Sequence, residues 1–211
     1  MDIESLLEKL THAGFDAVFV ENAAEARAQV EKIIEQRRAD MQKPPHELTV
    51  SWGGSKTLDE CGIRDLVCEK YNALNPYAFP KEEQTQAKRQ ALLSDIFLMS
   101  TNALCESGEL VNIDGNGNRL GALIYGPDTV ICVIGVNKIV PDVKSAYARI
   151  KKIACVKNAK RLNRATPCAQ NGVCGNCYID SQTICSHTVI TRFCSPKGRI
   201  KLVIVNEELG F

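Results

Sequence analysis

The sequence predicts an α/β domain of three layers, in which helices cover both faces of a mostly parallel sheet. Short apolar runs rich in β-branched residues, at 96–99 and 130–136, have the length and composition of buried strands. They alternate with amphipathic helical segments and short connections, which is typical of a parallel sheet. With 211 residues and 45% hydrophobic content, residues 1–211 are long enough for one domain.

The first elements follow from apolar spacing and from chain breakers. Residues 3–10 place apolar side chains on one helical face, and Gly14 ends that helix before a short strand, DAVFV. A second helix is predicted from residue 23 to about 41. Pro44-Pro45 then separates it from the strand ELTVSW, which runs into a glycine turn.

The remaining elements continue the alternation. Residues 63–71 fit either a helix or a strand followed by a loop, and residues 81–93 form a polar helix before the 96–99 strand. A short helix is expected at 119–125, and a longer helix opens after Pro141. Near the end, HTVITRF and RIKLVIV are predicted to be antiparallel neighbours at a sheet edge.

The stretch ESGELVNIDGNGNR, between the two central strands, predicts a ligand-binding loop. It mixes acids, amides and glycines, and glycine lets a ligand approach the main chain closely. Open α/β sheets bind ligands at the carboxyl ends of their strands. The alternative is a plain hairpin at Asp114-Gly115. A dinucleotide fingerprint is excluded by Leu120 at its last glycine position, and a calcium loop by Arg119 and Tyr125 at its glycine and glutamate positions.

A second candidate ligand site is the turn Gly53-Gly54-Ser55-Lys56-Thr57. Thr57 and Glu60 have the spacing of a capping box, which predicts a helix N-terminus at Thr57. Free N–H groups and the helix dipole at such a point suit an anion. The Walker pattern is absent, and the alternative is a tight turn that binds nothing.

Glu106 and Lys138 are the candidate catalytic residues. A glutamate ahead of a glycine turn can attack a carbonyl or abstract a proton when desolvation raises its pKa. Lys138 follows a buried strand, where it could hold an anionic group of a substrate. The alternative for each is a surface or capping residue.

The sharpest chemical signal is a cysteine-rich segment at about 165–195. Cys168, Cys174, Cys177 and Cys185 have the spacing C-x5-C-x2-C-x7-C, which suits a tetrahedral metal site holding zinc or an iron–sulfur cluster. Further ligands could come from Cys155 and Cys194. The alternatives are a redox disulfide at Cys174–Cys177 and unligated thiols. Elsewhere in the chain, Cys68 and Cys132 are predicted to be simple core residues.

Composition limits the partners of the protein. A net charge of +1 gives no global field toward nucleic acid or membrane, and no apolar run approaches the length of a membrane span. The N-terminus lacks the features of a signal peptide, so we expect a cytoplasmic location. Residues 144–164 carry eight basic and no acidic side chains, which form either a solvated helix face or a local field for an anion.

Several of these segments together resemble the lactate-utilisation (LUD) domain family. The match includes SWGGSKTL, LSDIFLMSTNALCESGELVNIDGNGNRLGALIYGP, IGVNKIV and RLNRATPC, and covers nearly the whole chain after about residue 45. It is closest to short members with a cysteine-rich C-terminal segment. The resemblance implies a fold like that of ribose-5-phosphate isomerase and CoA transferases. It also implies a role in organic-acid oxidation beside iron–sulfur partners.

The leading hypothesis is a lactate-utilisation-like protein that binds a small anionic metabolite and holds a metal or iron–sulfur centre supporting organic-acid oxidation. A redox protein partner and oligomerisation are compatible with this role. The alternatives are an isomerase or CoA-transferase type of enzyme that uses Glu106 and Lys138, or a non-catalytic regulatory subunit. The expected ligand-binding residues are Gly53, Gly54, Ser55, Thr57, Asn112, Asp114, Gly115, Asn116, Gly117, Asn118, Arg119 and Asn137.

Overall fold

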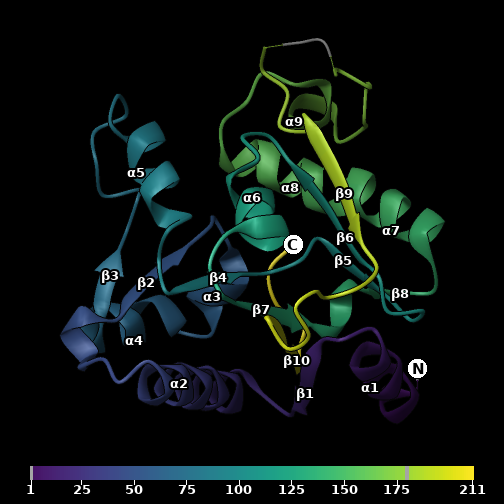
Figure 1. Cartoon of the computed structure of the whole chain (residues 1–211). Helices are drawn as coiled ribbons and strands as arrows, with labels where there is room; N and C mark the ends of the chain where they lie inside the picture. The colour runs from purple at the N-terminus through teal and green to yellow at the C-terminus, as the bar shows by residue number, and fades with distance from the viewer. Residues whose placement is uncertain (1, 179–180) are drawn as a thin grey trace.

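The main sheet consists of six parallel strands (Figure 1). The computed structural model describes residues 2–178 and 181–211. The strands of the main sheet are β1 (Asp16–Val20), β2 (Thr49–Trp52), β3 (Asn72–Leu74), β4 (Ile96–Met99), β7 (Thr129–Gly135) and β10 (Ile200–Val205). Their spatial order is β1-β10-β7-β4-β2-β3, so β2, β4 and β7 are direct neighbours.

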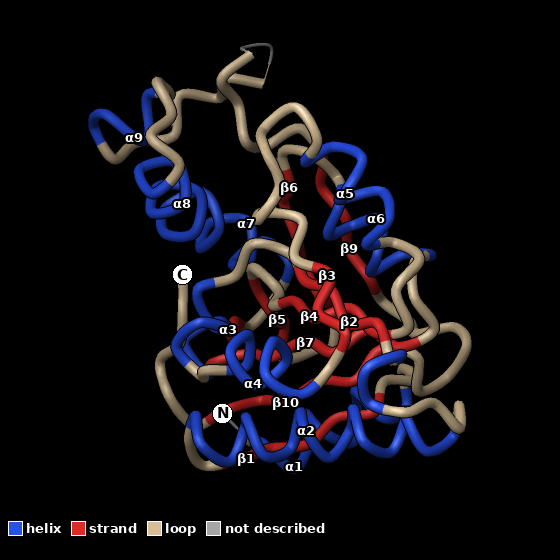
Figure 2. The backbone as a smooth tube through the Cα atoms, turned by 90° about the vertical axis from the view of Figure 1, so that its left-hand side faces the viewer, coloured by secondary structure: helices blue, strands red, loops and turns tan. Residues whose placement is uncertain are grey.

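Helices cover both faces of this sheet, which confirms the predicted three-layer α/β architecture. The helices are α1 (Ile3–His12), α2 (Ala23–Asp40), α3 (Lys56–Glu60), α4 (Ile63–Lys70), α5 (Gln84–Ala91), α6 (Asn118–Tyr125), α7 (Val143–Arg149), α8 (Cys155–Arg161) and α9 (Pro167–Asn171). Side chains of α2, α3 and α4 pack on one face of the sheet, and those of α1 and α6 pack on the other. Figure 2 shows the strands gathered at the centre with helices around them.

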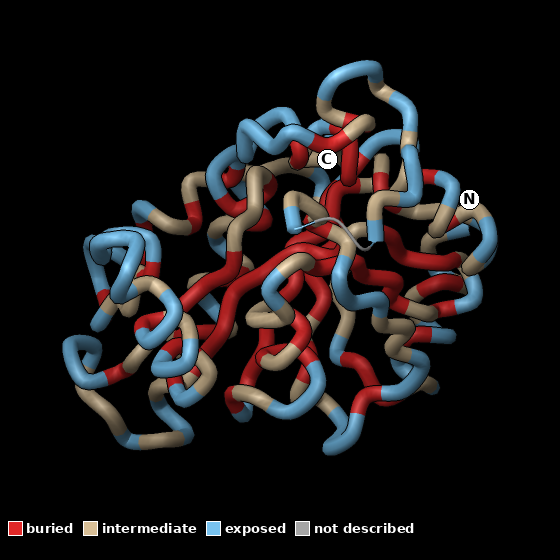
Figure 3. Tube along the Cα trace, turned by 90° about the horizontal axis from the view of Figure 1, so that it is seen from above, coloured by how far each residue is buried: buried red, intermediate tan, exposed pale blue. Residues whose placement is uncertain are grey.

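The central strands are apolar on both faces because each face is covered. In β7, Ile131 and Val133 contact the α2 side, whereas Val130 and Ile134 contact the α1 side, and all four are fully buried. Successive side chains of a strand point to opposite faces, so a continuous apolar run is required here. The buried residues accordingly follow the central strands in Figure 3.

A second, four-stranded sheet packs beside the first, and the sequence did not indicate it. Its strands are β5 (Ala103–Cys105), β6 (Leu110–Asp114), β8 (Ile139–Val140) and β9 (His187–Thr191), in the order β8-β5-β6-β9. The predicted loop 106–119 is therefore partly wrong, because residues 110–114 form a fully buried strand antiparallel to β5. Alternating Asn112 and Asp114 gave that strand the polarity of a loop.

The prediction that the last two strands are antiparallel neighbours at a sheet edge is wrong. β9 pairs antiparallel with β6 in the second sheet, whereas β10 lies between β1 and β7 and is parallel to both. Burial explains the separation. Four consecutive residues, 202–205, are fully buried in β10, as a central strand requires, whereas β9 is exposed or half-buried along its length.

The helix predicted after Pro141 is present as α7 and α8, joined by a π-helical turn at Ile150–Ala154. It packs on the outer face of the second sheet. The ambiguous region 61–80 contains both α4 and β3, and α5 is shorter than predicted. Within residues 2–178 and 181–211, no helix is long and apolar enough to cross a membrane.

Candidate functional site at the strand ends

A cavity of about 1220 Å³ opens at the carboxyl ends of β2, β4 and β7, and we call it the strand-end cavity. Its wall combines the start of α3, the loop between β6 and α6, the end of α8 and part of the cysteine-rich segment. Among its lining residues are Ser55, Thr57, Ser100, Asp114, Arg119, Lys138, Arg161 and Ile184. The location agrees with the expectation that ligands bind where parallel strands end.

Lys138 is the central residue of the strand-end cavity. It lies in a short 3-10 turn directly after β7, and only 3% of its surface is exposed. Its Nζ donates hydrogen bonds to Thr57 Oγ1 at 2.7 Å and to Ser100 Oγ at 2.8 Å. Thr57 follows β2 and Ser100 follows β4, so three adjacent strands bring these side chains together.

Burial, and after it the nearby guanidinium groups of Arg149 and Arg119, lower the pKa of Lys138 to about 7. Glu60 and Cys61 act in the opposite direction. Among the described residues, no carboxylate lies within 4 Å of Lys138 Nζ. The amine therefore exchanges between its neutral and charged forms near neutral pH, which a surface lysine does not do.

Asp114 and Arg119 form the rigid side of the cavity. Arg119 donates from Nε to Asp114 Oδ2 at 2.9 Å and from its NH2 group to the carbonyl of Ile113 at 2.9 Å. Asp114 Oδ1 also accepts the N–H groups of Asn116 and Gly117, which shapes the loop before α6. One carboxylate thus fixes both the loop and the arginine.

The glycine turn after β2 is built to let this arginine pass. A β carbon at Gly53 would lie 2.3 Å from Cγ of Arg119, so the arginine stem crosses the turn where a side chain would stand. The helix begins two residues earlier than predicted: Ser55, not Thr57, is the N-cap of α3 and accepts the N–H of Leu58. Thr57 is thereby free to meet Lys138.

The strand-end cavity brings together most of the predicted ligand-binding residues. The predicted residues that line it are Gly54, Ser55, Thr57, Asp114, Gly115, Asn116, Asn118, Arg119 and Lys138. Four others do not line it: Gly53, Asn112, Gly117 and Asn137. They act as supports: the Asn112 side chain accepts the N–H of Asn102, and that of Asn137 accepts the N–H of Leu209.

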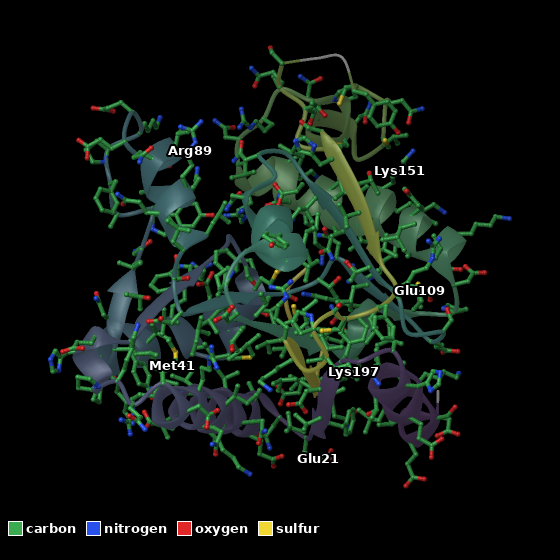
Figure 4. All side chains as sticks on the ribbon, in the orientation of Figure 1. Glu21, Met41, Arg89, Glu109, Lys151 and Lys197 are labelled. Carbon is green, nitrogen blue, oxygen red and sulfur yellow. The ribbon has the colours of Figure 1, made fainter. Side chains whose placement is uncertain are left out.

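Glu106 lies outside the cavity and apart from Lys138. It is in the turn between β5 and β6, where its N–H donates to Val140 and its carbonyl accepts from Lys9 of α1. Figure 4 marks Glu109, at the other end of this turn, toward the side of the molecule where β6 begins. The structure therefore does not place the two predicted catalytic residues in one site.

Two parts of the site were not predicted. Ser100 follows a fully buried strand, and a polar residue at that point is the signal that could have identified it. The segment 207–211 folds over the cluster: a β carbon at Gly210 would lie 2.5 Å from Thr57 Oγ1 and 3.2 Å from Lys138 Nζ. In Figure 1 the chain accordingly ends at the centre of the molecule, beside α6.

The predicted metal-binding cysteines lie in one region of the chain but not in one cluster. Within the described residues, no three cysteine, histidine, aspartate or glutamate side chains are grouped so that they could hold a metal ion. Cys168 Sγ lies 3.3 Å from Thr166 Oγ1, Cys174 Sγ lies 3.7 Å from Asn176 Oδ1 and Cys177 Sγ lies 3.9 Å from Thr183 Oγ1. The four-cysteine metal site stays a prediction.

The close sulfur contact is between Cys155 and Cys185, whose Sγ atoms are 3.5 Å apart. This contact raises the pKa of Cys155 and lowers that of Cys185, so Cys185 is the thiol of the pair that ionises first. Lys151, marked in Figure 4, favours that charge further. Cys194 is fully buried on the α1 side of the main sheet, where its thiol donates to the carbonyl of Pro196. It is therefore a core residue rather than a neighbour of the other thiols.

The two cysteines predicted to be core residues differ. Cys132 is fully buried in β7, as expected. The prediction for Cys68 is wrong, because this residue is exposed and lines the strand-end cavity. It occupies the outward side of α4, whose inward positions Leu66 and Val67 supply the apolar contacts.

Electrostatics favour an anion in the strand-end cavity. Among its described lining residues, eight are lysine or arginine and three are aspartate. Two of the aspartates are already paired, Asp59 with Arg64 and Asp114 with Arg119. The remaining positive charge includes Arg161 and Arg164, which belong to the basic run at 144–164, predicted to be either a solvated helix face or a local field for an anion.

The LUD domain pattern matches residues 3–205, almost the whole chain. The chain belongs to the LUD domain family. Family membership supports the prediction of a lactate-utilisation-like protein. The crystal structure of a DUF162 family protein from Deinococcus radiodurans is similar, with a TM-score of 0.51 and 14% sequence identity over 96% of this chain and 94% of that chain. At this identity the likeness shows the fold alone. No curated protein matches the chain.

Proposed function

We propose that this LUD-domain protein binds a small organic acid in the strand-end cavity. The observation that carries the proposal is the buried Lys138, bonded to two hydroxyls and to no carboxylate of the described residues, at the floor of a positively charged cavity. The basic wall supplies attraction for the ligand's carboxylate. The cluster of Lys138, Thr57 and Ser100 supplies hydrogen-bonding partners for the polar group next to that carboxylate.

Family membership supports the choice of ligand class. Lactate and pyruvate are small 2-substituted acids of the kind a lactate-utilisation-like protein would handle, and the cavity is large enough for either. The carboxylate and the neighbouring oxygen of such acids match a site that combines cations with hydroxyls.

Calorimetric titration with lactate and pyruvate tests the proposal. We expect saturable binding to the unmodified protein and an affinity about tenfold to a hundredfold lower in Lys138→Gln, because a hydrogen bond to a charged group is worth about 1.5–3 kcal/mol. The matched control is Lys201→Gln, which removes a lysine paired with Asp16 on the protein surface. Unchanged affinity in Lys138→Gln would contradict the proposal.

A metal centre in the cysteine-rich segment is a second candidate function. Two sulfurs bound to one tetrahedral zinc ion lie about 3.8 Å apart, close to the 3.5 Å between Cys155 and Cys185. Cys168 and Cys174 are near enough to raise the pKa of Cys155. Elemental analysis of anaerobically purified protein tests this candidate, and Cys155→Ser with Cys185→Ser should remove the metal. Iron without zinc would indicate a cluster.

The isomerase or CoA-transferase alternative finds less support, because Glu106 does not line the cavity that contains Lys138. A redox protein partner, an oligomeric state and a cytoplasmic location stay predictions.

A further inference from the structure

Lys138 has the surroundings of a nucleophile as well as those of an anion-binding residue. The residue lines the strand-end cavity although only 3% of its surface is exposed. The two atoms it contacts, Thr57 Oγ1 and Ser100 Oγ, are hydroxyl oxygens rather than carboxylate oxygens. No carboxylate of the described residues forms an ion pair with this amine, and burying an unpaired charge is expensive.

The neighbouring guanidinium groups also favour the neutral form of the Lys138 amine. Arg149 donates to the carbonyls of Asn137 and Asn102, which fixes its charge beside the turn that carries Lys138. With burial, these charges lower the pKa of Lys138 to about 7, so a large share of the amine is neutral at neutral pH. A desolvated lysine close to other cations is one way by which proteins activate an amine toward a carbonyl carbon.

The two hydroxyls can serve the proton transfers of that reaction. A hydroxyl both donates and accepts, and each hydroxyl here already accepts a hydrogen bond from Lys138. Thr57 Oγ1 also donates a hydrogen bond to the carbonyl of Leu209 at 3.4 Å, and Ser100 Oγ donates one to the carbonyl of Thr101 at 3.4 Å. Both bonds are long for a hydroxyl donor, so either hydroxyl can turn and donate instead to the oxygen that leaves the carbon attached to Nζ.

We propose that Lys138 forms an imine with the carbonyl carbon of a 2-oxo acid bound in the strand-end cavity. The inference rests on the proposed function, since the basic wall must first hold the carboxylate. The neutral amine attacks the carbonyl carbon, and a proton moves from nitrogen to oxygen to give a carbinolamine. The C–O bond then breaks, a C=N bond forms and one water molecule leaves, so no oxidant or reductant is required.

This chemistry distinguishes the two members of the ligand class. A 2-hydroxy acid such as lactate has no carbonyl at C2 and can bind only through non-covalent contacts. A 2-oxo acid such as pyruvate can bind in both ways. The geometry therefore assigns the site a covalent preference for the oxidised partner of a hydroxy acid/oxo acid pair.

Trapping with sodium cyanoborohydride tests the inference. The protein is incubated with pyruvate and the reductant, and intact-mass analysis is followed by peptide mapping. We expect one reduced pyruvate adduct per chain, located at Lys138, and no adduct with lactate. Lys138→Arg, which keeps the charge but not the nucleophilic amine, should lose the adduct. Lys43→Arg, at a half-buried lysine paired with Asp95, should keep it.

Mapping of the unmodified protein keeps the test valid even if Lys138→Arg fails to fold. An adduct spread over several lysines, or none at Lys138, would overturn the inference. Thermal-shift measurements without reductant separate the two proposals. Stabilisation by lactate and pyruvate without an adduct would overturn the imine and leave the proposed function standing, whereas no stabilisation and no adduct would overturn both.

Discussion

The strand-end cluster and the cysteine-rich segment lie against the same cavity but are held in opposite ways. The strand-end cluster consists of Lys138, Thr57 and Ser100. Lys138 follows β7, Ser100 follows β4, and Thr57 lies at the start of α3 after β2, so buried strands of the main core fix all three side chains. The cysteine-rich segment rests on a small apolar cluster made up of Val156, Ala159, Cys168 and Ile184. One side of the cavity is therefore held by the main core, whereas the other is held by this small cluster.

The loop after β6, which lines the same cavity, meets the cysteine-rich segment through the backbone. A β carbon at Gly115 would lie 3.1 Å from the Cα of Ile184, so the loop after β6 presses directly on the cysteine-rich segment. A change in how the thiols are bound can therefore reach the cavity wall through Ile184. We therefore expect the core to fix the position of Lys138, and the opposite wall of the cavity to respond to how its sulfurs are bound.

The largest expected effect is a truncation in the main core. Leu202→Ala in β10 removes a fully buried side chain from the centre of the parallel sheet. We expect a loss of about 2–5 kcal/mol in the free energy of unfolding, measured by urea denaturation. Ile184→Ala, in the small cluster, is the matched comparison and should cost about 1 kcal/mol. Equal losses would contradict the contrast between the two regions.

The second effect is a pH dependence that belongs to Lys138. Its pKa is lower in the folded protein than in the unfolded chain, so the unfolded chain binds the extra proton between about pH 7 and 10.5. The stability of the unmodified protein should therefore rise with pH in that window, by about 2 kcal/mol between pH 7 and 9.

The variant Lys138→Met removes the titrating amine but keeps the groups that act on it, which are Arg149, Arg119, Glu60 and Cys61. The difference between the two proteins therefore gives the contribution of Lys138 to the pH dependence. Urea denaturation at each pH should show that the rise is lost in the variant. A parallel rise in both proteins would show that Lys138 titrates normally in the folded state.

A third prediction concerns the passage of Arg119 over the glycine turn. Gly53→Ala places a β carbon where the arginine stem runs, so the arginine must move away from Asp114. We expect a loss of about 1–3 kcal/mol in thermal or urea unfolding. Gly121→Ala, inside α6 with ordinary contacts to Leu92, should instead gain about 0.5–1 kcal/mol. An unchanged free energy of unfolding in Gly53→Ala would mean that the turn accommodates a β carbon without displacing Arg119.

The smallest expected effect concerns the cysteine-rich segment and its response to a metal ion. Adding Zn²⁺ to metal-free protein should slow protease cleavage within residues 165–186 and leave urea unfolding of the main core nearly unchanged, because the segment contributes little to that core. Cys155→Ser should abolish the protection, because it removes one of two adjacent sulfurs. Protection that persists in Cys155→Ser would place the metal on other thiols.

The sequence was sufficient for the central strands β4 and β7 because these strands are buried on both faces. The runs at 96–99 and 130–136 are apolar throughout, and that pattern has few structural alternatives. The second sheet was missed because β6 carries Asn112 and Asp114, which are buried by hydrogen bonds and an ion pair rather than by apolar contacts. Buried polar residues of this kind look like loop residues in a sequence.

The site was only partly predictable for a related reason. Lys138 and Thr57 stood out as polar residues at the ends of predicted strands, but their contact depends on β2, β4 and β7 being neighbours, which local patterns do not specify. Glu106 fitted a short pattern, yet the pairing of β5 with β6 turns it toward α1. Pairing order between distant segments, rather than residue type, decides which candidates meet.

The most direct test of the account is a crystal structure of the protein grown with saturating pyruvate. The account predicts electron density for the ligand in the strand-end cavity, with its carboxylate toward the basic wall and its C2 carbon within bonding or contact distance of Lys138 Nζ. A cavity empty of ligand beside a well-ordered Lys138, or pyruvate bound only elsewhere on the surface, would contradict it.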